Sequence, residues 1–299
     1  AQTAPSPAGA ELQVKQMLAR RCARGGKKIR EVDVINKVQN YYDKSVDVEW
    51  TRMDRHPLEF EITKRHIEQF IMPKSKIVDI GGGPGKYSFY FASKGHKVTL
   101  VDLSPNNISY ANTKQNEIGI KLEQTIVGNA IDVSFLPSES YDVVFCMGPL
   151  YHLIDSIDRS SVINECKRVV KKNGFIVFSF ITVMAQMISL LKRNCEKIDE
   201  WYEHLVNTIS SGINNPEFDS EFTEAFFIHP FEIENYIKSN GLEVIKLAGA
   251  EGFANQSEEI LKKLPKEKLN KWIELTYKYT EDKSIIGSNQ HVICIAKKM

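Results

Sequence analysis

The sequence lacks the features of several common protein classes. No apolar run approaches the length of a membrane span. Basic and acidic residues nearly balance, at a net charge of +1, so neither nucleic acid nor an anionic membrane is expected as a partner. The five cysteines are scattered, with no C-x-x-C pair and no Cys/His cluster at zinc-ligand spacing. We therefore expect no metal site, and mostly buried, reduced thiols in a cytoplasmic protein.

The composition of the chain changes after residue 26. The first 26 residues are rich in Ala, Arg, Gly and Pro and contain no Ile, Asn, Asp, Phe or Tyr, whereas the chain that follows is rich in Lys, Ile and Asn. We predict that residues 1–26 are a tag, a leader or a targeting segment outside the fold. The remaining length suffices for one large domain that carries an insertion.

Residues 27–72 have a helical pattern and are predicted to form an N-terminal cap. Pro57, followed by Glu59 in the first turn, predicts the start of a helix. The charges of residues 52–66 are then explained mostly by a solvated helix start. A Glu59 or His56 side chain that faces the binding pocket is the alternative interpretation.

From residue 73 onward, predicted strands and helices alternate. The strands are KIVDI, KVTLVD, KLEQTIVG, YDVVFCMG and FIVFSFI, the last preceded by a KKNG loop. This order predicts an α/β fold with a doubly wound, mostly parallel sheet, which binds ligands beyond the carboxyl ends of its strands. Residues 73–181 are the predicted core, 182–228 a helical lid at that edge, and 229–299 the completion of the sheet with C-terminal helices.

A glycine-rich turn follows the first predicted strand. Its pattern is D-x-G-x-G-x-G from Asp79 to Gly85, and Lys86 stands where a dinucleotide site has its third glycine. Glycines let the backbone approach a ligand closely, and Asp79 is placed to favour the ammonium and sulfonium charges of S-adenosylmethionine (SAM). Asp102 ends the second strand, where a carboxylate can accept hydrogen bonds from both ribose hydroxyls, as it also does in NAD sites. The turn therefore favours SAM over a dinucleotide.

Three later motifs, VGNA, MGPLYHL and RVVKKNG, extend this pattern. Asn129 of VGNA can offer its carbonyl oxygen to the adenine amino group. Together with VDIGGGPG and LVDLS, these motifs resemble the class I SAM-dependent methyltransferases, in the broad group that includes the ubiquinone and menaquinone C-methylating enzymes. Those relatives usually have Asp at the position of Asn129.

The resemblance covers roughly residues 70–180, with the closing strands in outline. It implies a seven-stranded Rossmann-like sheet whose last strand is antiparallel. It also implies SAM as the cofactor and S-adenosylhomocysteine (SAH) as the product. The predicted cofactor-binding residues are Asp79, Gly81, Gly82, Gly83, Gly85, Asp102, Leu103, Asn129, Ala130 and Met147.

Methyl transfer from a sulfonium needs mainly alignment and desolvation, and a general base only where the acceptor is a poor nucleophile. His152 in MGPLYHL is the predicted base because the pKa range of histidine suits proton removal near neutral pH. A helix cap or a structural hydrogen bond is the alternative role. Tyr42 is predicted to contact the SAM carboxylate or to close the pocket, with packing between cap and sheet as the alternative.

Further residues are predicted to meet the methyl acceptor, each with a structural alternative. The tyrosines among them can simply pack, the histidine can cap a helix, and the acids can belong to a solvated helix start or an ordinary loop. These candidates are Tyr41, Tyr151, Glu59, His229 and Glu251.

The predicted activity is transfer of a methyl group from SAM to an oxygen, nitrogen, sulfur or carbon atom of a small molecule. Methylation of RNA or protein is one alternative, and a SAM-binding module without catalysis is another. An NAD-dependent oxidoreductase is disfavoured by Lys86 and by VGNA.

Overall fold

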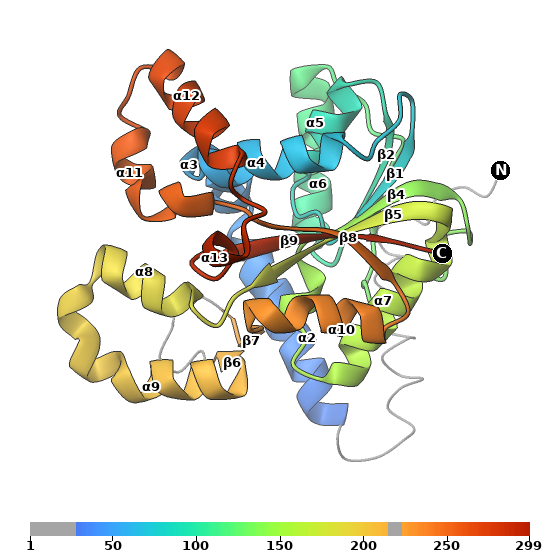
Figure 1. Cartoon of the computed structure of the whole chain (residues 1–299). Coiled ribbons are helices and arrows are strands. Elements are labelled where there is room, and N and C mark those ends of the chain that lie inside the picture. Colours follow the sequence, from blue (N-terminus) through green and yellow to red (C-terminus); the bar gives the residue numbers. More distant parts are fainter. Residues whose placement is uncertain (1–27, 215–222) are drawn as a thin grey trace.

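The protein is built around a seven-stranded sheet of order β3-β2-β1-β4-β5-β9-β8, seen in a computed structural model that describes residues 28–214 and 223–299 (Figure 1). Strand β9 is antiparallel to both of its neighbours, and the first five strands pair in parallel. This topology confirms the predicted doubly wound sheet. Residues 1–26 lie outside the described residues. The strands are β1 Lys76–Ile80, β2 Lys97–Asp102, β3 Gln124–Val127, β4 Tyr141–Cys146, β5 Val170–Ile181, β8 Glu243–Gly249 and β9 His291–Lys297.

Helices cover both faces of the sheet, because successive strand residues point to opposite faces. Val78 and Ile80 pack into one apolar layer, and Ile77, which immediately precedes Val78, packs into the other. The first layer includes side chains of α7 (Ser156–Val169) and α10 (Ile233–Ser239). The second includes side chains of α5 (Lys86–Ser93) and α6 (Pro105–Ile118).

Local sequence chemistry places the ends of α6 where the sequence predicted them. The Ser104 hydroxyl accepts a hydrogen bond from the backbone N–H of Asn107, Pro105 is the first helical residue, and Gly119 ends the helix at a φ of +69°.

The sequence predicts a loop at KKNG, but the structure shows a continuous strand there. The segment belongs to β5, whose register with β4 shifts between Tyr141 and Val143. Asn173 takes a φ of +62°, which Asn tolerates better than most residues, and its N–H bonds to the carbonyl of Lys298. The backbone therefore bulges and keeps its hydrogen bonds, and the strand does not end.

Further helices gather at the carboxyl edge of the parallel strands (Figure 1). The N-terminal helices α3 and α4 pack on each other, and α4 packs on the C-terminal α12 through buried side chains such as Leu58 and Ile273. Pro57 is the first residue of α4, as predicted. These elements are α2 Lys28–Lys44, α3 Val46–Arg55, α4 Pro57–Glu68, η1 Pro149–His152, η3 Pro230–Glu232, η4 Gly252–Ser257, α11 Glu258–Leu261, α12 Lys266–Tyr277 and α13 Lys283–Ile286.

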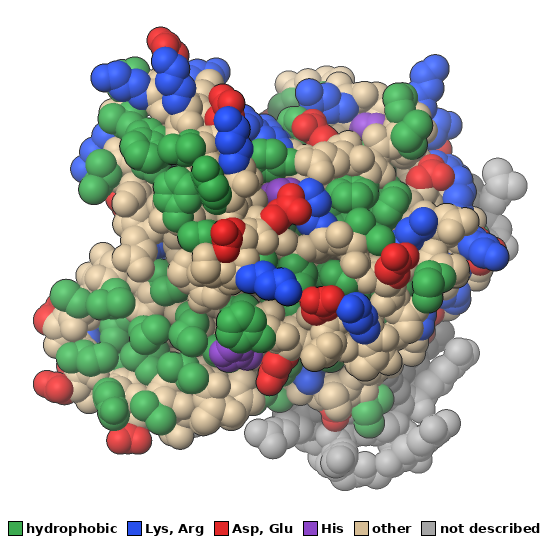
Figure 2. Space-filling view, viewed as in Figure 1, with side chains coloured by type: hydrophobic (Ala, Val, Ile, Leu, Met, Phe, Trp, Pro, Cys, Tyr) green, Lys and Arg blue, Asp and Glu red, His purple; other side chains and the backbone are tan. Residues whose placement is uncertain are grey.

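The segment after β5 is mainly helical and projects from the body of the molecule (Figure 1). Apolar side chains gather on its surface in Figure 2. Leu191, Tyr202 and Val206 are among the exposed apolar residues of this segment. Within the described ranges, no helix combines the length and the apolar character needed to cross a bilayer. The elements are α8 Ala185–Arg193, η2 Cys195–Lys197, α9 Ile198–Ser211, β6 Ile213–Asn214 and β7 Ala225–Phe226.

Replacing Leu58 with Ala should show how firmly the N-terminal cap is anchored. Leu58 is fully buried between α4 and the C-terminal helices, so the cavity left behind should lower the free energy of unfolding by about 2–5 kcal/mol. Urea denaturation measures this loss. Met72→Ala, at an exposed position just beyond the same helix, should stay within about 0.5 kcal/mol of the parent protein. Equal free energies of unfolding for the two variants would contradict the role of Leu58 in anchoring the N-terminal cap.

Candidate active site

A cavity of about 170 Å³ lies beyond the carboxyl ends of β1, β2 and β4. This is the edge at which open parallel sheets bind their ligands. The cavity is lined by the glycine turn, by residues after β2 and β3, by η1 and by the helices α2 and α3 of the cap. All the predicted cofactor-binding residues except Gly85 line it.

The glycine turn is shaped for close approach. A Cβ on Gly81 would lie 2.5 Å from the ring of Pro149, so this glycine lets the turn touch the loop after β4. Gly83 has a φ of +59° and open space where its Cβ would be, so a ligand can lie directly against its backbone. Gly85 has a φ of +90° and precedes α5, where it packs against Leu100 outside the cavity lining.

Asp102 is held rigidly at the end of β2. Its carboxylate accepts hydrogen bonds from the N–H of Gly83 at 2.8 Å, the N–H of Ser104 at 2.9 Å and the amide of Asn107 at 3.0 Å. Burial raises its pKa, and these three bonds act in the opposite direction. The carboxylate therefore borders the cavity in a fixed orientation.

Asp79 is buried directly behind the turn, at the end of β1. It is 2% exposed and accepts a hydrogen bond from the hydroxyl of Ser88 at 2.7 Å. Burial raises its pKa to about 7, and the nearby Asp102 adds to the shift, while the bond from Ser88 opposes it. A cation bound in the cavity would favour the ionised form of this carboxyl.

The residues of the cavity fit SAM. The open space at Gly83 can take the methionine chain, the two carboxyls can meet its cationic groups and its ribose, and Leu103, Ala130 and Met147 supply apolar surface. The side-chain oxygen of Asn129 accepts a hydrogen bond from the N–H of Ile131 at 3.0 Å. A carbonyl oxygen can accept a second bond, so the adenine contact stays a prediction.

His152 and Tyr42 form a hydrogen-bonded pair on the wall of the cavity. The Tyr42 hydroxyl lies 2.7 Å from Nε2 of His152, and the Thr223 hydroxyl lies 2.9 Å from Nδ1. Burial lowers the pKa of His152 to about 3 and raises that of Tyr42. The pair connects α2 to η1 and to the segment before β7. The catalytic roles of both residues stay predictions.

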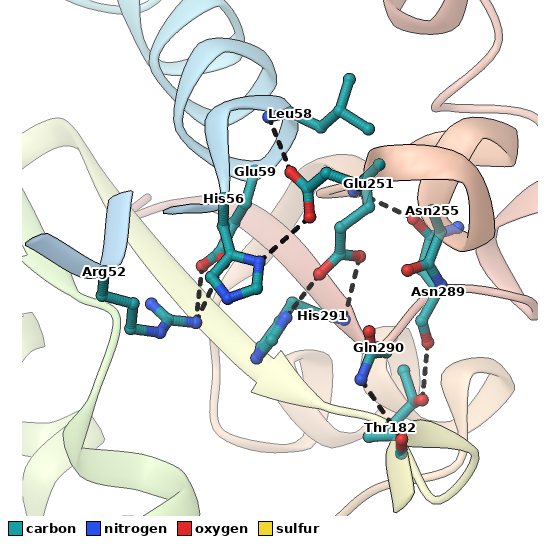
Figure 3. A network of polar contacts seen from close by, with 12 residues as sticks. Arg52, His56, Leu58, Glu59, Thr182, Glu251, Asn255, Asn289, Gln290 and His291 are labelled. Carbon is teal, nitrogen blue, oxygen red and sulfur yellow. Dashed lines mark hydrogen bonds and ion pairs between the residues drawn. The ribbon is translucent and has the colours of Figure 1, made fainter. Parts of the chain in front are cut away.

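A second, smaller cavity of about 50 Å³ adjoins the first. Arg52 and Tyr151 are among the residues that line both. Arg52 donates two hydrogen bonds to Glu59, at 2.9 and 3.1 Å, and this pairing outweighs burial to lower the pKa of Glu59 (Figure 3). Nearby, the ring of His291 contacts Glu251 at 2.5 Å. Charged groups around this cavity are therefore paired with one another.

The predicted acceptor residues fall in different places. Tyr151 lines both cavities and Glu59 lines the smaller one. Glu251 contacts His291 from outside the cavity lining. Tyr41 packs edge-on against Tyr42 and lines neither cavity. His229 also lines neither cavity. Its side chain accepts a hydrogen bond at the start of η3, in agreement with the alternative prediction that it caps a helix.

Sequence reasoning missed Arg52, Ser179 and His291. The charge pattern of residues 52–66 favours a solvated helix start, yet Arg52 is paired with a buried acid. A signal for His291 was present: it is the polar residue that begins the last buried strand. An antiparallel strand begins where its parallel neighbours end, so its first residue lies at the binding edge.

Glu59, Glu251 and His291 bring ligand-type atoms within 4.8 Å of one another. The guanidinium of Arg52 already neutralises Glu59, and a proton shared by Glu251 and His291 accounts for the remaining contact. This donor set is explained by an ion pair and a hydrogen bond, and we assign no metal to it.

The sheet order, the glycine turn and the acid at the end of β2 together define a SAM-binding domain of class I. The family described as "Methyltransferase domain" matches residues 78–178. The ubiquinone biosynthesis O-methyltransferase of Pseudomonas savastanoi is 30% identical over 176 residues, covering 58% of this chain and 67% of that protein. Its namesake from Azoarcus is 26% identical over 176 residues, covering 58% and 66%.

Solved structures share the fold. A SAM-dependent methyltransferase from Methanosarcina mazei has a TM-score of 0.52 at 21% identity, covering 78% of this chain and 96% of that one. Magnesium protoporphyrin IX methyltransferase from Synechocystis, solved with bound SAH, has a TM-score of 0.53 at 13% identity, covering 89% and 100%. The chain therefore belongs to the class I SAM-dependent methyltransferases, and SAM is its cofactor. Its match spans about two thirds of the length of the curated relatives.

The raised pKa of Asp79 predicts how SAM affinity depends on pH. A bound cation favours the ionised carboxyl, so affinity should rise with pH, by up to about tenfold per unit, and level off above about 7. Isothermal titration at several pH values measures this slope. Asp79→Asn should flatten it, whereas Asp142→Asn, at the opposite edge of the sheet, should not. An equal slope in the parent protein and in Asp79→Asn would refute the assignment.

Proposed function

We propose that the protein methylates a small molecule, by in-line displacement at the methyl group of SAM. The observation that carries the proposal is the second cavity, which shares five lining residues with the first: Arg52, Met53, Tyr87, Met147 and Tyr151. An acceptor in the smaller cavity would therefore lie against the residues that also border the cofactor. Its volume of about 50 Å³ suits one end of a small molecule.

Bound SAM supplies an electrophilic methyl group on a sulfonium that is already a good leaving group. The side chains of this protein would then act mainly by orienting the reactants and excluding water. Met53 is buried at the boundary between the two cavities, and Tyr151 borders both. The Tyr42–His152 pair is proposed to hold the cap against the cofactor, because it links α2 to η1.

Charge and similarity also support a small acceptor. The net charge is +1, and in Figure 2 basic and acidic side chains are interspersed over most of the visible face. A nucleic-acid substrate would be expected to bind in a basic groove. The relatives are named ubiquinone biosynthesis O-methyltransferase, a name that refers to the synthesis of a small molecule. Methylation of RNA or protein, and SAM binding without catalysis, are the outcomes that would replace the proposal.

A screen of acceptors tests this proposal directly. The protein is incubated with SAM and with phenols, amines, thiols or quinones, and SAH formation is measured. We expect at least one small-molecule class to be methylated. Asp102→Ala is the control, because losing the carboxylate at the end of β2 should weaken SAM binding by about 10- to 100-fold. Turnover on RNA or protein alone, or SAM binding without any turnover, would overturn the proposal.

A further inference from the structure

The ring of His291 is fixed in one orientation by Glu251. Glu251 is 5% exposed, and one of its oxygens accepts from Nδ1 of His291 at 2.5 Å while the other accepts from the backbone N–H of the same residue at 3.2 Å (Figure 3). The backbone N–H of Glu251 donates in turn to the side chain of Asn289 at 3.0 Å. A carboxylate on Nδ1 keeps the proton there and leaves the lone pair on Nε2.

Nε2 of His291 is the nitrogen left for a ligand. Across residues 28–214 and 223–299, no group hydrogen-bonds to this atom, and the side chain retains 20% exposure. The ring lines the smaller cavity together with the polar side chains of Thr63, Tyr87 and Ser179. A basic nitrogen and hydroxyl groups thus share a small chamber that borders the cofactor cavity.

The charges around His291 come from several elements. Glu59 of α4 and Glu251 after β8 are negative, and Arg52 of α3 is positive. The phenols of Tyr87 and Tyr151 line the same chamber, and Lys192 of α8 bonds to the neighbouring Gln290. Although burial disfavours the charged ring, the two carboxylates outweigh it and raise the pKa of His291. The ring is therefore a stronger base than an ordinary buried histidine.

We propose that the smaller cavity receives a hydroxyl-bearing acceptor, that Nε2 of His291 takes the hydroxyl proton, and that Glu251 is the positioning residue that orients the ring. The proposal rests on the proposed methyltransferase function. A hydroxyl is a poor nucleophile until it loses its proton, so it is the acceptor class that needs such a base. A neutral amine or a thiolate is already nucleophilic and has no comparable need.

The transfer step balances without a further reactant. The acceptor oxygen gives its proton to Nε2 as its lone pair forms the new bond to the methyl carbon. The methyl–sulfur bond breaks, and its electron pair stays on sulfur. The imidazolium, stabilised by Glu251 and Glu59, then returns its proton to solvent.

A coloured phenol tests the proton transfer without turnover. The probe is 4-nitrophenol, whose phenolate absorbs visible light, added to the complex of the protein with SAH. In the parent protein, binding should move its ionisation to lower pH, because His291 accepts the proton. His291→Asn should abolish this shift. His56→Gln is the matched control, since His56 pairs with Glu258 at 3.0 Å outside both cavity linings and the shift should persist.

Turnover of catechol tests the same step kinetically. His291→Asn should lose about 10²- to 10⁴-fold in kcat, with SAH affinity and thermal unfolding retained as evidence of an intact fold. Glu251→Gln should move the acid limb of the pH–rate profile to lower pH, because the carboxylate raises the pKa of the base. A merely structural residue would lower activity without moving this limb. His152→Ala should leave the limb in place.

Specific results would overturn the inference. The inference is contradicted if 4-nitrophenol does not bind, or if His291→Asn shows the same ionisation shift as the parent protein. It is also contradicted if the acid limb moves in His152→Ala and stays in place in Glu251→Gln. Methylation of amines or thiols but of no phenol would also refute it while leaving the proposed function standing. Absence of methylation for every small molecule would instead refute the proposed function.

Discussion

The insertion of β9 between β5 and β8 is the constraint on which the rest of the structure depends. This strand is almost fully buried, and its ladders attach β8 to the parallel strands. Because it runs antiparallel, its first residue, His291, is paired with Ile181 at the carboxyl end of β5. The last strand of the chain thus delivers a polar side chain to the same edge as the glycine turn. A parallel strand in that place would begin at the opposite edge.

Charged groups at this edge are stabilised in pairs that also join distant segments. Arg52 and Glu59 tie α3 to α4, while the pair of His56 and Glu258 ties the start of α4 to α11. Well-packed apolar residues often stabilise a fold as well as buried ion pairs do. Pairs concentrated beside a cofactor cavity are therefore better explained by function than by stability alone. The same contacts hold the cap against the sheet.

The sequence predicted those features that depend on short-range signals. The sheet, the ends of α6, and the turn from Asp79 to Gly85 follow from spacing within a few residues, and the structure contains them. The smaller cavity depends on contacts between distant residues, such as Glu251 with His291, which are 40 residues apart. No local periodicity encodes the contact between a side chain after β8 and one at the start of β9. The KKNG segment shows a related limit, because its bulge depends on pairing with the far C-terminus.

Two histidines near the cavities show how environment, and not residue type, separates their chemistry. His152 has hydroxyl partners on both nitrogens, and burial lowers its pKa to about 3, so it is a neutral hydrogen-bonding group at physiological pH. His291 has a carboxylate partner on one nitrogen, and its pKa is raised. Groups whose surroundings shift their pKa values in opposite directions are suited to different tasks. The motif that contains His152 is recognisable in the sequence, but the charges that would make a histidine basic are gathered around the other ring.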